Sequence, residues 1–281
     1  MNTSVTFSTA KPAFALQKFI AYYYFQTQDK PQAEHSFLYF PHFKNALTIY
    51  KNSEAENYKD ASYIKSNTEI NYTILFSTIY KSSRFIKISG RFDKVGIVFN
   101  PLGIQYFLQE EALSTILQDD LHFHHFGRHF TACLDQVYAA TAIDEKVKLL
   151  DTFFNANIQS FTNELLQQAI ARIHADDIKY TVQTLADTLG VHRRKLLRVF
   201  QKHLCCSVKV YLDTVQFRKA FTTYQLAESK PSLTSLSYNN NYFDQSELIK
   251  HFKKLTKNNP SKLFKNVVHL GDEDTFWQVN N

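Results

Sequence analysis

The feature that most constrains the fold is a helical pattern that occurs twice in the C-terminal third of the chain. In the first copy, a stretch with apolar residues at helical spacing ends at Gly190, and a second amphipathic stretch covers residues 191–204. Glycine suits the left-handed backbone that ends many helices. A short helix, a tight turn and a second amphipathic helix form a helix-turn-helix unit. Its predicted inward face comprises Val182, Leu185, Ala186 and Leu189, then Leu196, Val199, Phe200 and Leu204.

The same pattern recurs 52 residues later, with a one-residue slip across the turn. Residues 209–229 separate the two copies and are long enough for a single helix. An internal repeat of this kind predicts two helix-turn-helix units joined by one helix. The corresponding pieces are Leu196 and Leu248, Phe200 and Phe252, VQTLA (182–186) and LTSLS (233–237), and SVKVYL (207–212) and NPSKLF (259–264).

The charge of the chain is concentrated in the same region. Residues 172–265 carry 17 Lys and Arg against 7 Asp and Glu, a net charge of +10, whereas the rest of the chain carries −4. A local excess of positive charge is typical of a surface that binds a polyanion. The alternative is that these basic side chains only keep the surface soluble.

The N-terminal part has a different pattern. Residues 35–108 contain short runs rich in Val, Ile, Thr, Phe and Tyr, which predict β-strands, and residues 105–175 have helical spacing. We therefore expect an α+β N-terminal domain, strands first and helices after, joined to an all-α C-terminal domain. The pattern lapses near residues 172–180, which places the boundary between domains 1–171 and 172–281. The aromatic segment FIAYYYFQ (19–26) is expected in the core, with a ligand wall or a dimer surface as alternatives.

Composition excludes several classes of protein. The chain has 281 residues with 25 Phe and 16 Tyr but only 6 Gly and 6 Pro, which favours folded cores over disorder. No apolar run approaches the ~20 residues of a membrane helix, and the N-terminus lacks the features of a signal peptide. The cysteines are Cys133, Cys205 and Cys206, an odd number without a metal-binding spacing. These features predict a cytoplasmic protein without a membrane partner.

The C-terminal segments resemble the AraC/XylS family of bacterial transcription regulators over residues 180–265. The resemblance rests on three segments: LADTLGVHRRKLLRVFQKHL, YLDTVQFRKA with Arg218 and Ala220, and NYFDQSELIKHFKKLTKNNPSKLF. The last follows the family signature of a Gly-Phe pair, an Asp, a Ser, then Phe-Lys-Lys and a closing Pro. The Gly-Phe pair is replaced by Asn241-Tyr242, and Cys205 and Lys257 replace the glycines that usually follow the recognition helices. Asn tolerates a left-handed backbone better than other non-glycine residues, so Asn241 is a reasonable substitute.

The N-terminal segment KVGIVFNPLGIQYFL, followed by LQDDLHFHHFG, is similar to a domain attached to some family members, which carries a G-x-x-F-x-P-x-G element after its strands. The resemblance implies that this domain binds a small-molecule effector, forms a homodimer, or does both. It also implies that the protein acts by presenting its DNA-contacting helices differently to DNA or to RNA polymerase.

Two predicted helices, residues 192–204 and 244–255, are the candidate first and second reader helices for double-stranded DNA. On each, the face opposite the apolar residues is the predicted base-contacting stripe, and the resemblance implies base contacts at the same positions. Arginine can pair with guanine and glutamine with adenine, while an apolar side chain can contact a thymine methyl group. The predicted stripes are Arg194, Leu197, Arg198 and Gln201 on the first helix, and Gln245, Ser246, Ile249 and Lys250 on the second.

Other basic residues are expected to contact phosphates, which position a protein without specifying sequence. Two readers joined by one helix would enter successive major grooves about 34 Å apart on one side of the duplex. The predicted phosphate-contacting residues are Arg193, Lys195, Lys202, Lys253, Lys254, Lys257 and Lys262.

No catalytic or cofactor motif accompanies these features. His122, His124, His125 and His129 are close in sequence but lack the Cys or HExxH elements of a metal site, so ordinary histidines are favoured. Nothing beside Cys205 and Cys206 indicates a reactive thiolate. We therefore predict a regulator that is not an enzyme and needs no cofactor or metal, associated with the nucleoid when bound to DNA. The alternatives are an enzyme-like N-terminal domain fused to a DNA-binding module, and an architectural protein indifferent to DNA sequence.

Overall fold

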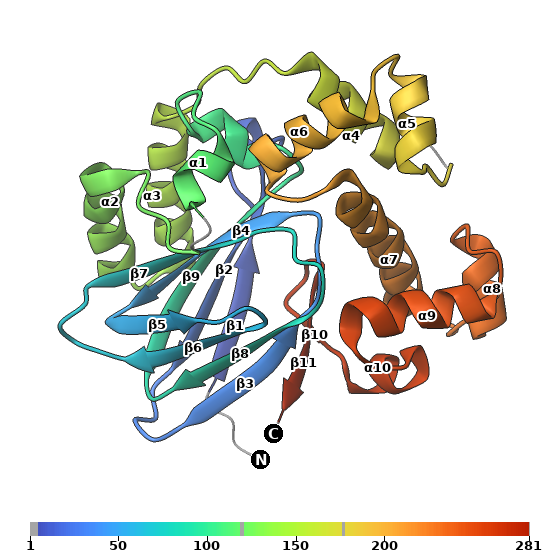
Figure 1. The fold of residues 1–281 in the computed structure, drawn as a ribbon. Helices are drawn as coiled ribbons and strands as arrows, with labels where there is room; N and C mark the ends of the chain where they lie inside the picture. Colours follow the sequence, from blue (N-terminus) through green and yellow to red (C-terminus); the bar gives the residue numbers. More distant parts are fainter. Residues whose placement is uncertain (1–4, 119–120, 176–177, 281) are drawn as a thin grey trace.

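The computed structural model of the chain describes residues 5–118, 121–175 and 178–280 (Figure 1). The N-terminal part contains two β-sheets that face each other. The first has the strand order β1 (Val5–Ala10), β2 (Ile20–Gln28), β9 (Phe92–Phe99), β4 (Asn45–Lys51) and β7 (Tyr72–Ser77). The second has the order β10 (Val268–Leu270), β11 (Thr275–Asn280), β3 (Glu34–Tyr39), β8 (Arg84–Ser89), β6 (Ala61–Ser66) and β5 (Ser53–Asn57). Neighbouring strands are antiparallel except β6 and β8, which are parallel.

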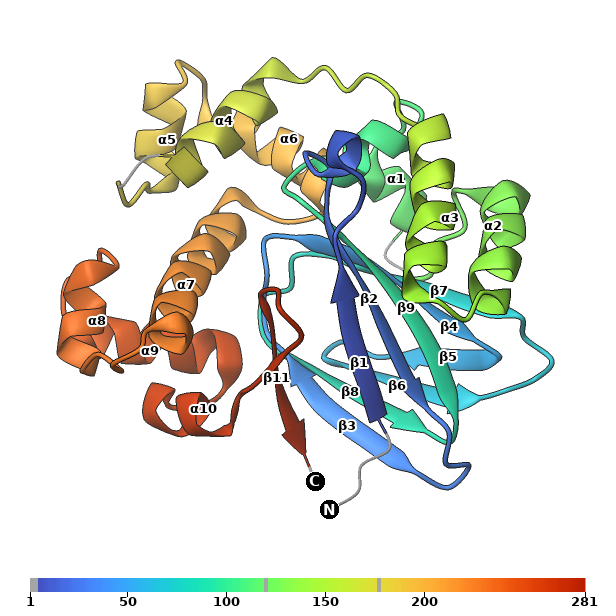
Figure 2. The ribbon, with the colours of Figure 1, turned by 180° about the vertical axis from the view of Figure 1, so that it is seen from behind.

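Both faces of the first sheet are buried. One face packs on the second sheet, where Tyr50 and Leu75 meet Phe37 and Ile88. Helices cover the opposite face (Figure 2), which explains the near-continuous apolar runs of strands β2, β4 and β9. The covering elements are η1 (Phe14–Leu16), η2 (Gly103–Phe107), α1 (Leu113–Leu117), α2 (Gly127–Ala139) and α3 (Ile143–Ala156).

Five short runs within residues 35–108 predicted strands β3, β4, β7, β8 and β9, and the helices follow the strands as predicted. The runs are HSFLYF (35–40), NALTIYK (45–51), NYTILFSTIY (71–80), SRFIKISG (83–90) and KVGIVF (94–99). Strands β1, β2, β5 and β6 were missed. Segment 19–26 largely forms β2, a central strand of the first sheet. Its alternating side chains serve two environments: Tyr23 and Phe25 pack under the helices, and Tyr22 and Tyr24 face the second sheet.

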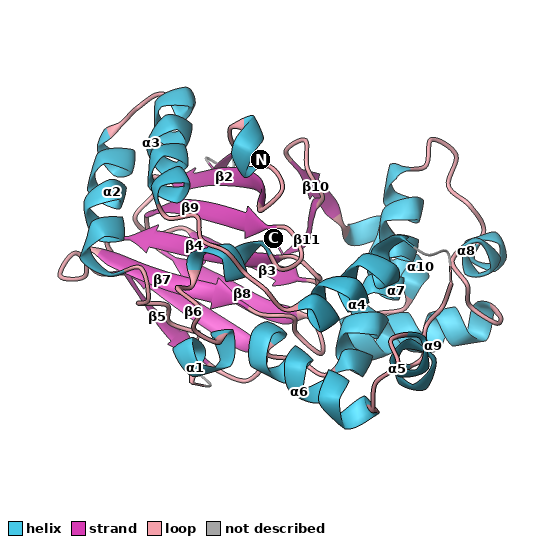
Figure 3. Ribbon diagram, turned by 90° about the horizontal axis from the view of Figure 1, so that it is seen from above, coloured by secondary structure: helices cyan, strands magenta, loops and turns pink. Residues whose placement is uncertain are grey.

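The C-terminal helices follow the predicted order. They are α4 (Glu164–Ala175), α5 (Val182–Thr188), α6 (Arg193–Leu204), α7 (Val208–Leu226), α8 (Leu233–Asn239), α9 (Gln245–Thr256) and α10 (Pro260–Asn266). Figure 3 shows them beside the sheets rather than over them. Two helix-turn-helix units, α5–α6 and α8–α9, are thus joined by the single helix α7, as the repeat predicted.

The helical region has two apolar clusters, one for each unit. In the first, Leu166 and Ile170 of α4 pack with Leu185, Leu196 and Phe200. The predicted boundary at residues 171 and 172 therefore falls within a helix that packs with the C-terminal helices; residues 176–177, where the pattern lapses, lie outside the described residues. The second cluster joins α7 to α8, α9 and α10 and also includes Phe40 and Phe276.

A C-terminal hairpin, which the sequence did not predict, returns the chain to the N-terminal part. Strand β10 pairs with β11, and β11 adds to the edge of the second sheet by pairing with β3, with Trp277 opposite Tyr39. Trp277 stacks on Phe37 with ring centroids 4.1 Å apart. The two ends of the described chain consequently lie close together (Figure 1).

Candidate DNA interface

The first helix-turn-helix unit is fixed by its caps and its turn. Thr181 caps α5 by accepting a hydrogen bond from the Thr184 backbone N–H at 3.1 Å, and Thr184 returns the contact as a capping box. The turn that follows has Gly190 at a φ of +63°, in the left-handed region. Helix α6 then begins at Arg193, and its N-cap residue, His192, makes no side-chain cap hydrogen bond. Leu196 and Phe200 bury the inner side of α6, as predicted.

The second unit has the same form with different caps. Ser232 caps α8, and Asp244 caps α9 by accepting a hydrogen bond from the Glu247 backbone N–H at 2.7 Å. Glu247 completes the cap, because its carboxylate accepts from the Phe243 backbone N–H at 2.6 Å. Leu248 and Phe252 bury the inner side of α9.

The three replacements of glycine adopt the conformation that glycine would provide. Asn241 in the second turn has a φ of +57°, and Cys205 and Lys257, which end α6 and α9, have φ values of +52° and +59°. All three lie in the left-handed region, which is strained for residues with a Cβ atom. The departures from the family pattern therefore leave the turn geometry unchanged and carry a local strain instead.

The predicted base-contacting stripes lie on the outer faces of α6 and α9. Arg194, Arg198 and Gln201 are exposed on α6, and Gln245, Ser246 and Lys250 are exposed on α9, while Leu197 and Ile249 are half-buried. The side chains of Arg194, Arg198 and Lys250 form no hydrogen bond or ion pair with any described residue. Gln245 accepts a hydrogen bond from the Thr234 hydroxyl at 2.9 Å, which holds it against α8. The exposed stripe cations are available to an outside partner.

The predicted phosphate-contacting residues are all exposed, but two of them are paired. Lys254 forms an ion pair with Asp213 at 2.8 Å, and Lys257 forms one with Asp60 at 3.3 Å. The remaining five, Arg193, Lys195, Lys202, Lys253 and Lys262, have no ion pair within residues 5–118, 121–175 and 178–280.

Asp213 is a structural residue that the sequence did not single out. It lies on α7 with its carboxylate largely buried, and it accepts from Lys209 at 2.7 Å and from Lys254 at 2.8 Å. Burial would raise the pKa of Asp213, but the hydrogen bonds from the two lysines outweigh burial and lower it. Asp213 therefore ties α9 to the helix that joins the two units.

Comparison with known protein families identifies the C-terminal helices. A family model described as "Helix-turn-helix domain" matches residues 185–266, which span both units. The C-terminal domain is of the AraC/XylS type. The chain is accordingly a DNA-binding transcription regulator. A second model, "Domain of unknown function (DUF6597)", matches residues 8–120.

Solved structures with weak similarity include one that aligns with most of this chain and two that are isolated domains. ToxT from Vibrio cholerae is 13% identical, with 92% of this chain and 98% of that chain covered and a TM-score of 0.48. The DNA-binding domain of AdpA, solved with a target DNA, is 17% identical over 37% of this chain and 92% of that chain, with a TM-score of 0.33. The C-terminal domain of AraT from Geobacillus stearothermophilus is 19% identical over 41% and 94%, with a TM-score of 0.35. A search of curated protein sequences found no match.

Both reader helices of this AraC/XylS-type domain contact the N-terminal part at their C-terminal ends. Gln105 donates to the His203 carbonyl at 2.8 Å at the end of α6. Ser83 donates its backbone N–H to the Leu255 carbonyl at 2.7 Å at the end of α9. The position of each reader helix is therefore linked to the N-terminal fold.

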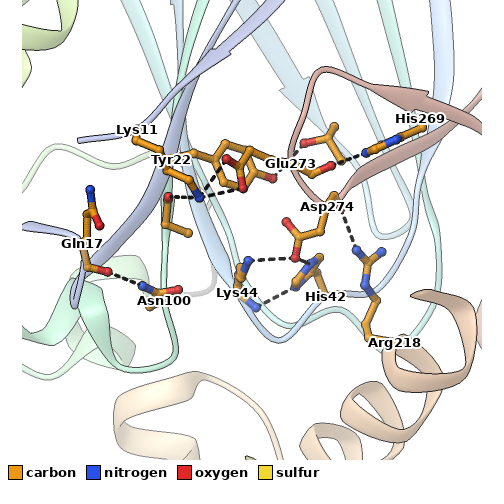
Figure 4. A network of polar contacts seen from close by, with 12 residues as sticks. Lys11, Gln17, Tyr22, His42, Lys44, Asn100, Arg218, His269, Glu273 and Asp274 are labelled. Carbon is orange, nitrogen blue, oxygen red and sulfur yellow. Dashed lines mark hydrogen bonds and ion pairs between the residues drawn. The ribbon is translucent and has the colours of Figure 1, made fainter. Parts of the chain in front are cut away.

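A polar network joins the C-terminal hairpin, the N-terminal sheets and helix α7 (Figure 4). Asp274 accepts from Lys44 at 2.8 Å and from His42 at 3.1 Å, and its backbone carbonyl accepts from Arg218 at 2.8 Å. Burial lowers the pKa of His42 to about 3, so its ring is neutral at pH 7. Burial would raise the pKa of Asp274, but these three neighbours hold it well below its usual range.

The same network borders a cavity between the two sheets, with a volume of about 80 Å³. Strands of both sheets, Arg218 of α7 and the C-terminal hairpin contribute to its wall. Its basic lining residues are Lys44, Arg84, Lys94 and Arg218, against one acidic residue, Asp274. The sequence did not predict this cavity as a whole. A ligand wall was one alternative for the aromatic segment 19–26, and two of its residues, Tyr22 and Tyr24, line the cavity.

The other candidates from the sequence show no functional geometry. His122 and His124 stack with ring centroids 6.3 Å apart, and the described residues contain no group of three or more side chains placed to hold a metal ion. Burial raises the pKa of Cys133 to about 11 and raises that of Cys206 further, which disfavours a reactive thiolate. In the part of the chain that the structure describes, no helix is long and apolar enough to cross a membrane.

Proposed function

We propose that the chain regulates transcription by binding a specific DNA site through α6 and α9, under the control of a small effector held between its two sheets. The observation that carries the first part is the pair of outward stripes on corresponding helices, whose cations Arg194, Arg198 and Lys250 are unpaired among the described residues. A guanidinium that is not used inside the protein can form the bidentate contact to guanine that gives sequence discrimination.

Residues outside the stripes would supply the affinity that does not depend on sequence. The five unpaired basic residues flank the stripes on the same helices or lie on α10, close to where phosphates would pass. Lys254 and Lys257 belong to this set only if DNA competes with Asp213 and Asp60 for them. Breaking the Lys254–Asp213 ion pair costs more free energy than breaking the Lys257–Asp60 pair, because the Asp213 carboxylate is largely buried whereas Asp60 is half exposed.

The effector role is supported by the connection between the cavity and the reader helices. Arg218 lies on α7, which joins the two units, and its guanidinium reaches the cavity wall. Phe276 of the hairpin packs against Phe221 of α7, with ring centroids 5.5 Å apart. A molecule that changes the cavity wall therefore acts on the helix that sets the spacing of the two readers.

The remaining parts of the proposal concern domains and partners. The boundary between the N-terminal domain (1–171) and the C-terminal domain (172–281) is retained as an approximate division, with α4 packing on the C-terminal side. A homodimer and RNA polymerase are the proposed protein partners, and the cytoplasm, at the nucleoid, is the proposed location.

The test is selection of bound fragments from the genome of the source organism, followed by competition with random DNA at fixed salt. A specific site should outcompete random DNA by about 10³-fold or more. Equal competition by random DNA would favour the architectural alternative. Turnover of a substrate by the purified chain would favour the enzyme-like alternative.

A further inference from the structure

Lys94 is a buried cation without a polar partner. It lies on β9 in the middle of the first sheet, with its side chain between the sheets and 1% exposed. Its ammonium forms no hydrogen bond or ion pair with any residue in the described ranges. An ammonium group has three hydrogen-bond donors, and burying it without acceptors is costly.

Aromatic rings surround the Lys94 ammonium. The nearest is Trp277 of the C-terminal hairpin, with 4.7 Å between Nζ and the ring centroid, and Phe37 follows at 5.2 Å and Tyr24 at 5.4 Å. Tyr50 and Phe92 complete the group at 5.7 and 6.0 Å. Ring faces attract a cation but accept no conventional hydrogen bond, so the donors of Lys94 stay unmet. We call these five rings and Lys94 the aromatic cage.

The aromatic cage depends on a glycine two residues further along β9. A Cβ atom added to Gly96 would lie 1.9 Å from the Tyr24 ring, which packs directly over the strand. Any larger residue would displace the ring that lies beside the Lys94 ammonium. The close approach thus holds one wall of the cage in place.

Lys94 differs from the other basic residues that line the cavity. Arg84 donates to Ser62 and to backbone carbonyls, Lys44 pairs with Asp274, and Arg218 donates to the Asp274 carbonyl. Among the basic lining residues that the structure describes, only Lys94 has a side chain without a hydrogen bond or an ion pair. The four basic groups also outnumber the single carboxylate, so the cavity favours negative charge.

We propose that the cavity binds a small carboxylate whose anionic group is held by the Lys94 ammonium inside the aromatic cage. A carboxylate supplies the acceptors that Lys94 lacks and the charge that the cavity favours. The volume of about 80 Å³ suits a ligand of a few heavy atoms, because one water needs about 10–15 Å³ on the same measure. This inference rests on the effector role proposed above and specifies its ligand class.

Binding should be linked to protonation of Lys94. Burial lowers the pKa of Lys94 to about 7, so a carboxylate that selects the ammonium form loses affinity above this pH. The groups that face Lys94 keep their charge state from about pH 6 to about pH 9. They are His35, with a pKa lowered to about 4, Tyr24, with a pKa raised to about 12, and Tyr50, with a raised pKa. Of the other lining groups, His42 and Asp274 have lowered pKa values. Burial also lowers the pKa of Arg84 and of Arg218, but a guanidinium keeps its proton in proteins.

Trp277, the single tryptophan of the chain, reports on the site because it lies nearest to Lys94. The experiment follows its fluorescence during titration of the full chain with propionate, benzoate and succinate, each beside its neutral amide. At least one carboxylate should bind more than about tenfold tighter than its amide, and its affinity should fall about tenfold per pH unit above pH 7. Lys94→Met should abolish this preference. Lys51→Met, whose cation lies 5.4 Å over the Tyr138 ring outside the cavity, should retain it.

Three results would overturn the proposal. They are equal binding of the amides, an affinity that is independent of pH, and no fluorescence response to any carboxylate at about 10 mM, where a site with a Kd of about 1 mM is roughly 90% occupied. The pH series uses the unaltered chain and so does not depend on folding of the variant. Each result leaves the DNA-site selection unaffected, whereas loss of site preference would refute the proposed function whatever Trp277 reports.

Discussion

The two candidate reader helices differ in their charge and in the way their N-termini are capped. Helix α6 is richer in positive charge, with Arg193, Arg194, Lys195 and Arg198 in its first two turns, yet its N-cap residue makes no side-chain hydrogen bond. Helix α9 has fewer cations, but side chains cap its N-terminus. Asp244 and Glu247 cap it, and Lys179, just before α5, pairs with Glu247 at 2.7 Å.

The two units therefore share the packing of their inner faces but differ in the contacts that their outer faces make. Buried leucine and phenylalanine recur at matching positions because both units need the same inner face. The outer face is free to vary. Here α6 has more of the positive charge, and α9 has the side-chain cap that α6 lacks. We expect α6 to dominate discrimination between bases and α9 to depend on its anchoring.

The largest expected effect is on recognition by the first reader. Arg198→Ala should weaken binding to the selected site by about 1–3 kcal/mol, because a bidentate contact to guanine is lost. Lys250→Ala should cost less, since an ammonium is a single-point donor. Fluorescence anisotropy with the selected site and a scrambled site, at one salt concentration, measures both. Arg128→Ala, an exposed arginine on α2, is the control. Full site preference in both reader variants would show that the predicted stripes are wrong.

The second prediction removes the anchor of α9. Asp213→Asn should lower the free energy of unfolding by about 1–3 kcal/mol, because a largely buried carboxylate with two charged hydrogen bonds is replaced. Urea unfolding measures the change. The matched control is Asp187→Asn, an exposed carboxylate of the first unit that accepts from Gln183 at 2.7 Å, which should change stability by less than about 0.5 kcal/mol. Equal effects of the two substitutions would contradict the asymmetry in anchoring.

The third prediction is the pH dependence of that anchor. The folded-state pKa of Asp213 lies below its ordinary value of 3.8, so its contribution is complete above pH 3.8 and is lost as the pH falls through the lower folded-state value. The stability difference between the wild type and Asp213→Asn should therefore be constant near neutral pH and shrink below about pH 3.8. Urea unfolding at several pH values tests this, and a difference that grows with acid would refute it.

The smallest expected effect concerns the two turns. Asn241→Gly should stabilise the chain by less than about 1 kcal/mol, because it relieves a left-handed backbone, and Gly190→Asn should destabilise it by a similar amount. No atom lies within 4 Å of a Cβ placed on Gly190, so its cost reflects backbone strain alone. Thermal unfolding measures both changes. If Asn241→Gly destabilised the chain, or Gly190→Asn stabilised it, the left-handed asparagine would not be the strained residue of the two turns.

The outward faces of the candidate DNA interface could be predicted because their signals are local. The spacing of Leu196 and Phe200, and its recurrence at Leu248 and Phe252, depends only on helical geometry and fixes which side chains face outward. The same reasoning could not find the pairing of Lys254 with Asp213, because charges on two helices meet only after packing. It also assigned no role to Lys94, since a lysine in a strand is ordinarily expected to face water.

The sequence by itself determined the helix-turn-helix repeat, the charge on α6 and the positions that require a left-handed backbone. These properties arise from neighbours within one or two turns. Tertiary structure alone decided the aromatic cage and the place of the C-terminal hairpin. Both depend on strands that are distant in sequence, such as β11 beside β3, and the pairing of distant strands is set by the whole fold rather than by local pattern. Lys94 is buried for the same reason, because β9 lies in the middle of a sheet that is covered on both faces.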